Sequence, residues 1–393
     1  MVTDASPIAD LHAATADLDP PLAALDLSAL RANAADLVRR ARGVPIRVAS
    51  KSVRCRAVLE EVLGSQLTGH GGFAGIMSYS LREALWLAGH GARDILLGYP
   101  SVDRAALAEL AADATLLDSI TLMVDDVAQL DLIRAAVGGA GISPRVCLDV
   151  DASLRIGPLH LGVRRSPIRT PEQAERLARV ARERGFRVAG VMTYEAQIAG
   201  LPDTNPAVRL VKRLSAAEIG TRRTHVLEAV RSVAGELEIV NSGGSGSIEV
   251  SVAAPEVTEV TAGSGLYVPT LFDGYRAFTP HPALYFALPV LRRPAAEIAT
   301  VFAGGYIASG PVGASRVPKP VWPKGLRLIG TEGAGEVQTP FTGAADLAVG
   351  DRVWMRHAKA GEVCERFDAI HIVDADDRRT TVPTYRGEGR NFG

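Results

Sequence analysis

One lysine follows a short apolar segment, and its amine could form a covalent bond with an aldehyde or ketone. Lys51 comes directly after the segment VPIRVAS (44–50), and it is the only one of the five lysines in the first 211 residues. A lysine at a strand end forms a Schiff base when desolvation or a nearby cation lowers its pKa, and Arg47 or Arg54 could supply that cation. The carbonyl could belong to a substrate, as in a class I aldolase, or to a cofactor. The alternative is a surface lysine with no chemical role.

Two segments rich in glycine and serine could present backbone N–H groups and hydroxyls to a phosphate. They are IVNSGGSGS (239–247), which follows an apolar run, and TAGSGLY (261–267). Glycine permits close approach of the backbone to an anion and positive φ, although either segment taken alone could be an ordinary turn. The candidate residues are Ser242, Gly243, Gly244, Ser245, Gly246, Ser264, Gly265 and Tyr267.

The elements that must position these residues alternate between short apolar runs and helical segments from about residue 22 to residue 245. The clearest expected strands are 44–50, 94–99, 146–151, 188–194 and 237–242, with weaker ones around Phe73 and Leu116. Uniformly apolar runs are typical of parallel strands covered on both faces. A (β/α)₈ barrel or an open doubly wound sheet would satisfy the pattern, and we favour the barrel because no GxGxxG follows the first strand. Lys51 would lie at the carboxyl end of the second barrel strand, the face where barrels carry active sites.

The pattern changes after about residue 255, where helical periodicity disappears. Short apolar runs separated by glycine and proline indicate an all-β module. We therefore expect an α/β barrel over 23–258, an all-β domain over 259–393, and an N-terminal segment (1–22) that packs on the β domain.

Charge and cysteine content exclude several classes of protein. Lys plus Arg total 43 and Asp plus Glu total 44, so there is no basic excess to attract nucleic acid or anionic lipid. The three cysteines are widely separated, as in a reduced cytoplasmic protein. The first residues do not resemble a signal peptide, and no run approaches the roughly 18 apolar residues of a membrane helix. We expect a cytoplasmic protein with a small-molecule substrate and no nucleic-acid or membrane partner.

The stretch LDLSALRANAADLVRRARGVPIRVASKSVRC resembles the opening of the alanine racemase-type fold III pyridoxal phosphate enzymes, and more closely the D-threonine aldolase and D-serine dehydratase branch. That branch has a helix beginning LxxLxxN and a strand ending Arg-Pro-His-x-Lys-Thr-x-Lys. Arg47 and Lys51 align with its arginine and its Schiff-base lysine, while the Pro-His pair is absent here. The resemblance implies that the barrel binds pyridoxal 5′-phosphate through Lys51.

Further matches follow in the family's order along nearly the whole chain. CLDVDASLRIG resembles the family's Asp-x-Asp-x-Gly-x-x-Arg stretch and puts Arg155 in the arginine place. VAGVMTYEAQ resembles its Gly-x-x-x-Tyr-Glu-Gly run and puts Tyr194 near the cofactor. SGGSG matches the phosphate loop, and AGSGLYV matches the turn beside the cofactor. The resemblance also implies a homodimer whose β domains help to close the sites.

The lyase branch holds zinc or another divalent ion through a His-x-Cys or His-x-Asp pair in its β domain. The corresponding region here is DRVWMRHAKAGEVCERFDAIHIV, where His357, Glu362 and Cys364 lie within eight residues. An imidazole, a carboxylate and a thiolate can all bind zinc. The spacing departs from the family's, so the alternative is a structural histidine, a loop carboxylate and a buried cysteine.

The resemblance implies a lyase that acts on a D-configured β-hydroxy amino acid. Retro-aldol cleavage would give glycine and an aldehyde, as in D-threonine aldolase, and dehydration would give a 2-oxo acid and ammonia, as in D-serine dehydratase. A divalent ion would assist by polarising the β-oxygen. One alternative is an amino acid racemase with the same cofactor, and another is a non-catalytic carrier of pyridoxal phosphate.

Overall fold

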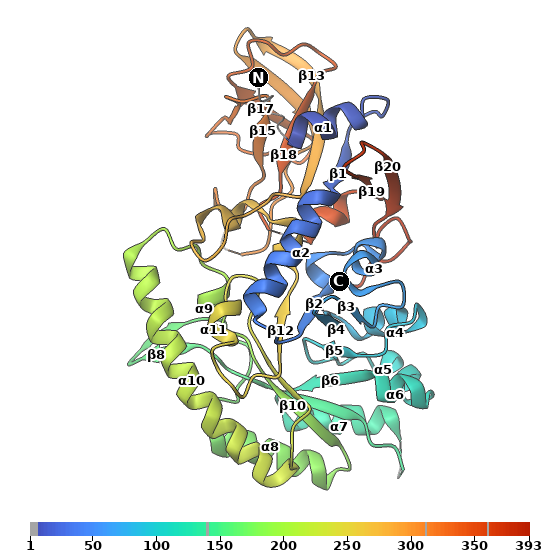
Figure 1. The fold of residues 1–393 in the computed structure, drawn as a ribbon, viewed down its shortest axis with the longest axis vertical. Helices are drawn as coiled ribbons and strands as arrows, with labels where there is room; N and C mark the ends of the chain where they lie inside the picture. Colours follow the sequence, from blue (N-terminus) through green and yellow to red (C-terminus); the bar gives the residue numbers. More distant parts are fainter. Residues whose placement is uncertain (1–6, 139–140, 311–312, 360) are drawn as a thin grey trace.

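Eight parallel strands form a closed barrel in the computed structural model, which describes residues 7–138, 141–310, 313–359 and 361–393 (Figure 1). Each strand pairs with its neighbour, and β2 pairs with both β12 and β4, which closes the ring. The strands are β2 (Ile46–Ala49), β4 (Phe73–Ser78), β5 (Ile95–Leu97), β6 (Ile120–Val124), β7 (Arg145–Val150), β10 (Arg187–Thr193), β11 (Ile239–Ser242) and β12 (Glu259–Ala262). The barrel expected from the alternating pattern is confirmed.

Helices surround this barrel, and their ends follow from local sequence. Thr170 caps α8 by accepting a hydrogen bond from the N–H of Gln173, whose side chain bonds back, and a proline opens the first turn. Ser80 caps α4 by accepting from the N–H of Glu83, but the Glu83 carboxylate bonds the N–H of Tyr79 instead of completing a box. The helices are α2 (Leu27–Ala41), α3 (Arg56–Leu63), α4 (Leu81–Gly89), α5 (Arg104–Ala111), α6 (Ala114–Ser119), α7 (Val127–Val137), α8 (Pro171–Glu183), α9 (Ala196–Ala199), α10 (Pro206–Ala234), α11 (Ile248–Ser251) and α12 (Ser264–Tyr267).

Two expectations about single elements were wrong. The segment around Leu116 is helical (α6), because Asp113 accepts hydrogen bonds from the first N–H groups of that turn, and the strand begins only at Ile120. The strand before Lys51 is the first of the barrel, not the second, because the preceding strand joins the other sheet. Short antiparallel additions are β3 (Gly69–His70) beside β4, and the hairpin of β8 (Leu154–Ile156) and β9 (Leu159–Leu161).

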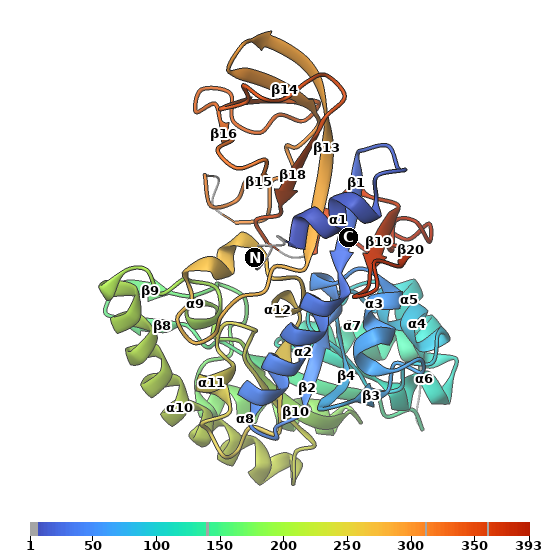
Figure 2. The same cartoon turned by 45° about the horizontal axis from the view of Figure 1, so that its top comes forward.

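A second sheet of nine strands lies beyond one end of the barrel (Figures 1 and 2). The early strand β1 lies within it, antiparallel to β13 and parallel to β19. Helix α1 (Pro7–Ala14) packs on this sheet through Ile8 and Leu11, which contact Trp354 and neighbouring apolar side chains. The strands are β1 (Leu22–Asp26), β13 (Leu284–Ala295), β14 (Ile298–Phe302), β15 (Lys319–Trp322), β16 (Arg327–Leu328), β17 (Gln338–Thr342), β18 (Arg352–Arg356), β19 (Ala369–Val373) and β20 (Arg379–Pro383).

Strand pairing suggests a division of the chain that differs slightly from the expected boundaries. The strand β12 (Glu259–Ala262) pairs with β11 and β2 inside the barrel, and β1 (Leu22–Asp26) pairs within the other sheet. We propose that the barrel domain runs from α2 to α12 and that the remaining described residues form the β domain.

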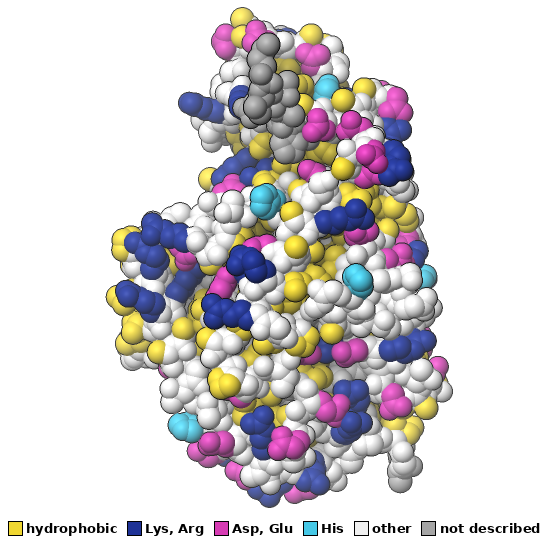
Figure 3. Space-filling view, in the orientation of Figure 1, with side chains coloured by type: hydrophobic (Ala, Val, Ile, Leu, Met, Phe, Trp, Pro, Cys, Tyr) yellow, Lys and Arg dark blue, Asp and Glu magenta, His cyan; other side chains and the backbone are white. Residues whose placement is uncertain are grey.

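Charged side chains of both signs are interspersed over the face of the molecule shown in Figure 3. This mixture agrees with a formal net charge of -1.

Within the described ranges, no helix combines the length and the apolar character that a bilayer crossing requires. The three cysteines, Cys55, Cys147 and Cys364, are free and buried.

Candidate active site

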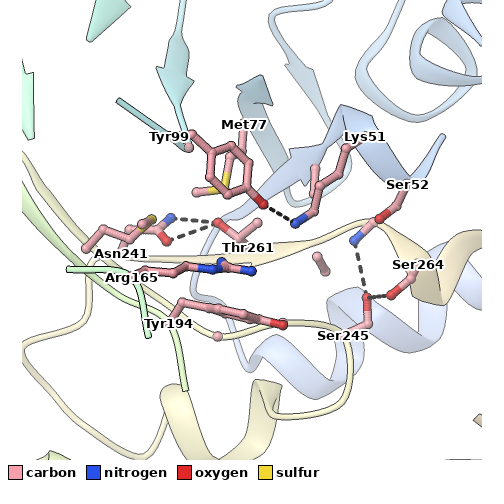
Figure 4. Close-up of a pocket in the computed structure, with 17 residues that line it drawn as sticks. Lys51, Ser52, Met77, Tyr99, Arg165, Tyr194, Asn241, Ser245, Thr261 and Ser264 are labelled. Atoms are coloured by element: carbon pink, nitrogen blue, oxygen red, sulfur yellow. Dashed lines mark hydrogen bonds between the residues drawn. The ribbon is translucent and has the colours of Figure 1, made fainter. Parts of the chain in front are cut away.

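A pocket opens at the carboxyl ends of the barrel strands, and we call it the barrel pocket (Figure 4). Most of its residues lie at or just after a strand end, so the parallel topology gathers them at one rim. It is lined by Ala49, Lys51, Ser52, Met77, Gly98, Tyr99, Arg165, Met192, Tyr194, Asn241, Gly243, Gly244, Ser245, Thr261, Ala262, Gly263 and Ser264.

Lys51 lies in a single 3₁₀ turn (Ser50–Ser52) after β2, and its amine points into the barrel pocket. Its Nζ is 2.5 Å from the hydroxyl of Tyr99, which follows β5. Burial acts to raise the pKa of Tyr99, but the charge and hydrogen bond of Lys51, together with Arg165, hold that pKa below its ordinary value. A short hydrogen bond therefore joins the amine to the phenol. Sequence analysis gave no role to Tyr99, which it placed at the end of the expected strand 94–99.

Arg165 lies between two tyrosine rings in the barrel pocket (Figure 4). Its Cζ is 5.5 Å from the ring centroid of Tyr99 and 5.4 Å from that of Tyr194, within the range of cation–π attraction. Burial raises the pKa of Tyr194 against the opposing charges of Lys51 and Arg165. The guanidinium therefore presents a fixed positive charge to the pocket. Sequence reasoning missed Arg165, since it lies in an irregular segment after β9 with no periodic or motif signal.

The two glycine- and serine-rich segments meet at the other side of the barrel pocket. The Ser245 hydroxyl accepts hydrogen bonds from the N–H groups of Gly263 and Gly265 at 3.2 and 2.9 Å, and it lies 3.4 Å from the hydroxyl of Ser264. A Cβ on Gly244 would lie 2.9 Å from the Cβ of Ala199, so only glycine fits there without displacement. Together these residues form a cradle of hydroxyls and backbone groups, which we call the glycine–serine cradle (residues 243–245 and 263–264).

One buried carboxylate accepts hydrogen bonds from the segment that forms part of this cradle. Glu195 accepts hydrogen bonds from the hydroxyl of Ser242 (3.1 Å), the N–H of Gly243 (3.2 Å), and the hydroxyls of Ser247 (3.1 Å) and Ser251 (2.6 Å). It follows Tyr194 in the sequence run that resembles the family motif, although sequence analysis gave it no role. Four donors converging on one carboxylate fix the path of residues 242–251.

Replacing Glu195 by glutamine is expected to weaken binding of pyridoxal phosphate by about tenfold or more, since hydrogen bonds to a charged group contribute about 1.5–3 kcal/mol. The amide NH₂ would also face donors instead of accepting from them. Fluorescence or absorbance titration with the cofactor measures the change. The matched control is Glu236→Gln, since the Glu236 side chain is 95% exposed. Equal affinity in both variants would contradict the role given to Glu195.

Several expected site residues lie outside the barrel pocket. Arg47 is buried and bonds Glu259 at 2.6 and 2.7 Å and Asp94 at 3.0 and 3.1 Å, so its guanidinium is engaged within the barrel wall. Arg155 lies on the β8–β9 hairpin, half-exposed, with its guanidinium 2.7 Å from Asp151. Arg47 and Arg155 do not line the pocket.

Four of the remaining expected cofactor residues have partners outside the pocket. The Ser242 hydroxyl is engaged by Glu195 and by Arg223 at 3.1 Å. Gly246 packs against Tyr275, where a Cβ would lie 2.5 Å from a ring carbon. Gly265 donates to Ser245, and the Tyr267 hydroxyl donates to the carbonyl of Val53 at 3.0 Å. Ser242, Gly246, Gly265 and Tyr267 do not line the pocket, whereas Lys51, Tyr194, Gly243, Gly244, Ser245 and Ser264 do.

The three expected metal ligands do not fit a common ion. His357 is fully buried beside Tyr267, with ring centroids 6.4 Å apart, and burial lowers its pKa to about 3. Cys364 is buried and its pKa is raised by that burial, which opposes formation of a thiolate. Glu362 points elsewhere and accepts a hydrogen bond from the N–H of Ser309 at 2.6 Å. Among the described residues, no three His, Cys, Asp or Glu side chains gather in a way that could hold a metal.

A buried carboxyl inside the barrel makes stability depend on pH. Burial, aided by Asp125 and Asp151 and opposed by Arg165, raises the pKa of Asp149 on β7 from 3.8 to about 7. The unfolded chain releases this proton near pH 4, whereas the folded chain keeps it to about pH 7. The free energy of unfolding should therefore fall as the pH rises between these values.

In cofactor-free wild-type protein, the Asp149 carboxyl should lower the free energy of unfolding by about 4 kcal/mol between pH 4 and pH 8. The Asp149→Asn variant should not show this decrease. Urea unfolding at several pH values measures it. The exposed Asp346→Asn variant is the control and should keep the wild-type profile. Parallel pH profiles for wild type and Asp149→Asn would show that this carboxyl does not cause the dependence.

The barrel pocket fits pyridoxal phosphate. The cofactor carries an aldehyde, an aromatic ring and a phosphate, and the pocket offers an amine at Lys51, the ring of Tyr194 and the glycine–serine cradle. The lack of side chains on Gly243, Gly244 and Gly263 leaves the cradle open to a bulky anion. Lys51 and the cradle are therefore the groups that could hold it.

A protein-family model matches the whole strand framework of the barrel. The family model described as "Alanine racemase, N-terminal domain" matches residues 25–270. These residues run from the last part of β1 into the segment after α12, so they include all eight barrel strands and the whole barrel pocket.

Relatives along the chain extend the likeness into the β domain. A D-threonine aldolase from Arthrobacter sp. is 26% identical over 297 residues, which are 74% of this chain and 72% of that protein. The crystal structure of D-threonine aldolase from Filomicrobium marinum has a TM-score of 0.78 and 21% identity, covering 95% of this chain and 96% of the other. D-threo-3-hydroxyaspartate dehydratase from Delftia sp. HT23 has a TM-score of 0.74 and 22% identity, covering 93% and 97%. Both structures share the fold of this chain.

Proposed function

The chain belongs to the family of the alanine racemase N-terminal domain, and from this premise we propose that it is a pyridoxal-phosphate-dependent lyase acting on D-amino acids with a hydroxyl on the β-carbon. The observation that carries the proposal is the opposition of the Lys51 amine and the glycine–serine cradle across one pocket. The similarity to a D-threonine aldolase and to a D-threo-3-hydroxyaspartate dehydratase supports the choice of a lyase.

The charged and aromatic residues of the pocket have distinct roles in this proposal. Lys51 would hold the cofactor through its aldehyde carbon, and the cradle would hold its phosphate through hydroxyls and backbone groups. Arg165 binds the α-carboxylate of the substrate, and Tyr194 packs against the ring. Arg47 and Arg155, which lie outside the pocket, act in our proposal only by supporting the barrel.

Proton movement falls to the Lys51–Tyr99 pair. Pyridoxal phosphate, when bound, supplies an electron sink for bonds at the α-carbon. The Lys51 amine, once exchanged for the amino group of the substrate, can take up a proton, and the Tyr99 hydroxyl 2.5 Å away can pass one on. Cleavage of Cα–Cβ gives glycine and an aldehyde, whereas loss of the α-proton and the β-hydroxyl gives a 2-oxo acid and ammonia.

Assembly is a further part of the proposal. We propose a homodimer, as the resemblance in the sequence implies, and sedimentation velocity of the cofactor-loaded protein measures it directly. A sedimentation coefficient matching 41.4 kDa would overturn the dimer without affecting the proposed reaction.

The test is incubation of cofactor-loaded protein with D-threonine and, separately, with D-threo-3-hydroxyaspartate, each with and without a chelator, followed by chiral analysis of all products. A lyase converts D-threonine to glycine and acetaldehyde or to 2-oxobutanoate and ammonia, and it converts the second substrate to glycine and glyoxylate or to oxaloacetate and ammonia. Loss of either activity in the presence of the chelator would show that a divalent ion takes part in the reaction.

Two outcomes would overturn the proposal. Formation of the epimer at the α-carbon without cleavage would make the protein a racemase with the same cofactor. Cofactor binding with no turnover of either amino acid, nor of other D-β-hydroxy amino acids, would make it a carrier of pyridoxal phosphate.

A further inference from the structure

A segment of the β domain extends the barrel pocket outward. Lys359 and Glu362, which follow β18 in the sequence, line the mouth of the pocket. The space beyond the cofactor region, which we call the outer chamber, is lined by Lys51, Tyr99, Arg165, Tyr194, Lys359 and Glu362, among others. A second lysine therefore faces the reacting lysine across the space into which a substrate side chain would extend.

Lys359 is held in place but is not neutralised. Its ammonium donates a hydrogen bond to the hydroxyl of Ser309 at 3.1 Å, and no carboxylate of the described ranges lies within 4.0 Å of it. Burial, with the positive charges of Lys51 and Arg316, lowers the pKa of Lys359, and Glu362 only partly opposes this. Neighbouring positive charges therefore destabilise the Lys359 ammonium, and a bound anion would stabilise it.

The charges of the residues that line the outer chamber also favour an anionic ligand. Arg54 is paired with Glu365 at 2.6 Å, which leaves Lys51, Arg165 and Lys359 as lining cations. Glu362 is the sole carboxylate among the described lining residues. In the proposed reaction Lys51 becomes engaged with the cofactor and Arg165 with the α-carboxylate. Lys359 then has no anionic partner unless the substrate brings a second one.

We propose that Lys359 binds an acidic group on the substrate side chain and thereby selects D-amino acids that carry a second carboxylate. This inference rests on the proposed function. The ammonium would form a charge-assisted hydrogen bond in a partly buried chamber, where such contacts are stronger than in water. Lys359 is thus a specificity residue contributed by the β domain to a site built by the barrel.

The test follows binding through the cofactor absorbance and does not require turnover. Cofactor-loaded protein is titrated with D-aspartate and with D-asparagine, which have nearly the same shape but differ in side-chain charge. Half-saturation with D-aspartate should come at a concentration about tenfold lower or more. Lys359→Gln, which keeps a donor for Ser309, should remove this preference, and Lys359→Arg should restore part of it. The exposed Lys324→Gln variant is the control and should behave as wild type.

The outcomes separate the inference from the proposed function. If Lys359→Gln weakens both ligands equally, or if the wild type does not distinguish them, Lys359 does not read side-chain charge, and the proposed lyase still stands. If the wild type takes up no cofactor, or if no amino acid changes its absorbance, the proposed function fails and the inference fails with it.

Discussion

Replacing Lys51 by alanine is expected to abolish covalent attachment of pyridoxal phosphate and to lower turnover by at least about three orders of magnitude. The side chain has two roles in the proposed reaction, since it binds the cofactor and then moves a proton at the α-carbon. Its Nζ lies 2.5 Å from the Tyr99 hydroxyl, and no other lysine lines the barrel pocket. Alanine removes the amine while leaving the 3₁₀ turn of residues 50–52 free to form.

Two measurements test this expectation. The absorbance band of the bound cofactor should disappear in Lys51→Ala after gel filtration, because the glycine–serine cradle alone holds the cofactor without a covalent bond. Borohydride treatment of the wild type should fix the cofactor on the peptide that contains Lys51, as mass spectrometry would show. The exposed Lys324→Ala variant is the control. A band retained in Lys51→Ala, or a label on the peptide containing Lys212, would refute the assignment.

Local sequence signals were enough to predict the barrel and most of the cradle. Parallel topology places the carboxyl ends of the strands together, so an amine after β2 and glycines after β11 and β12 lie at one rim. No long-range contact has to be known to predict this arrangement. The same locality explains the cap of α8, where Thr170 and Gln173 lie within one turn. These features depend on residues close in sequence or on the order of strands, and both can be read from the chain.

The arginine of the site could not be predicted in this way. Arg155 occupies the motif position, but the β8–β9 hairpin turns it towards Asp151. Arg165 follows that hairpin in an irregular segment, and the return of the chain to the barrel brings it between Tyr99 and Tyr194. The direction of a side chain after a hairpin depends on tertiary packing, which sequence spacing does not encode.

Closeness in sequence misled the prediction of the metal site for a related reason. His357 follows the end of β18 and is buried, while Cys364 belongs to a 3₁₀ turn (Glu362–Arg366) and is also buried. Although the three expected ligands lie within eight residues, two of them are buried and only Glu362 lines the outer chamber. In our proposal the residue of this segment that contacts the substrate is Lys359. A search for metal ligands does not find it, because lysine is not one of the residue types that such a search considers.

The contact between the β domain and Lys51 depends on one glycine, whose replacement should be far more damaging than its position in a loop suggests. Gly361 has φ of +98°, and a Cβ there would overlap the carbonyl oxygen of Lys51 and lie 3.2 Å from the Cα of Ser52. Alanine at positive φ lowers the stability by about 1–2 kcal/mol, and its Cβ also pushes the segment that carries Lys359 away from Lys51. The second effect displaces the reacting lysine, and a displacement near 1 Å can reduce turnover about a hundredfold.

Gly350 provides a control that separates these two effects. It also lies in the β domain with φ of +97°, but a Cβ there would meet nothing within 4 Å. Gly350→Ala should therefore show only the loss of stability that positive φ causes, with kcat/KM close to wild type. Gly361→Ala should lose additional stability and should also lose turnover and cofactor affinity, as thermal unfolding, steady-state kinetics and cofactor titration would measure. If the two variants behaved alike, the close approach of Gly361 to Lys51 would not position the reacting lysine.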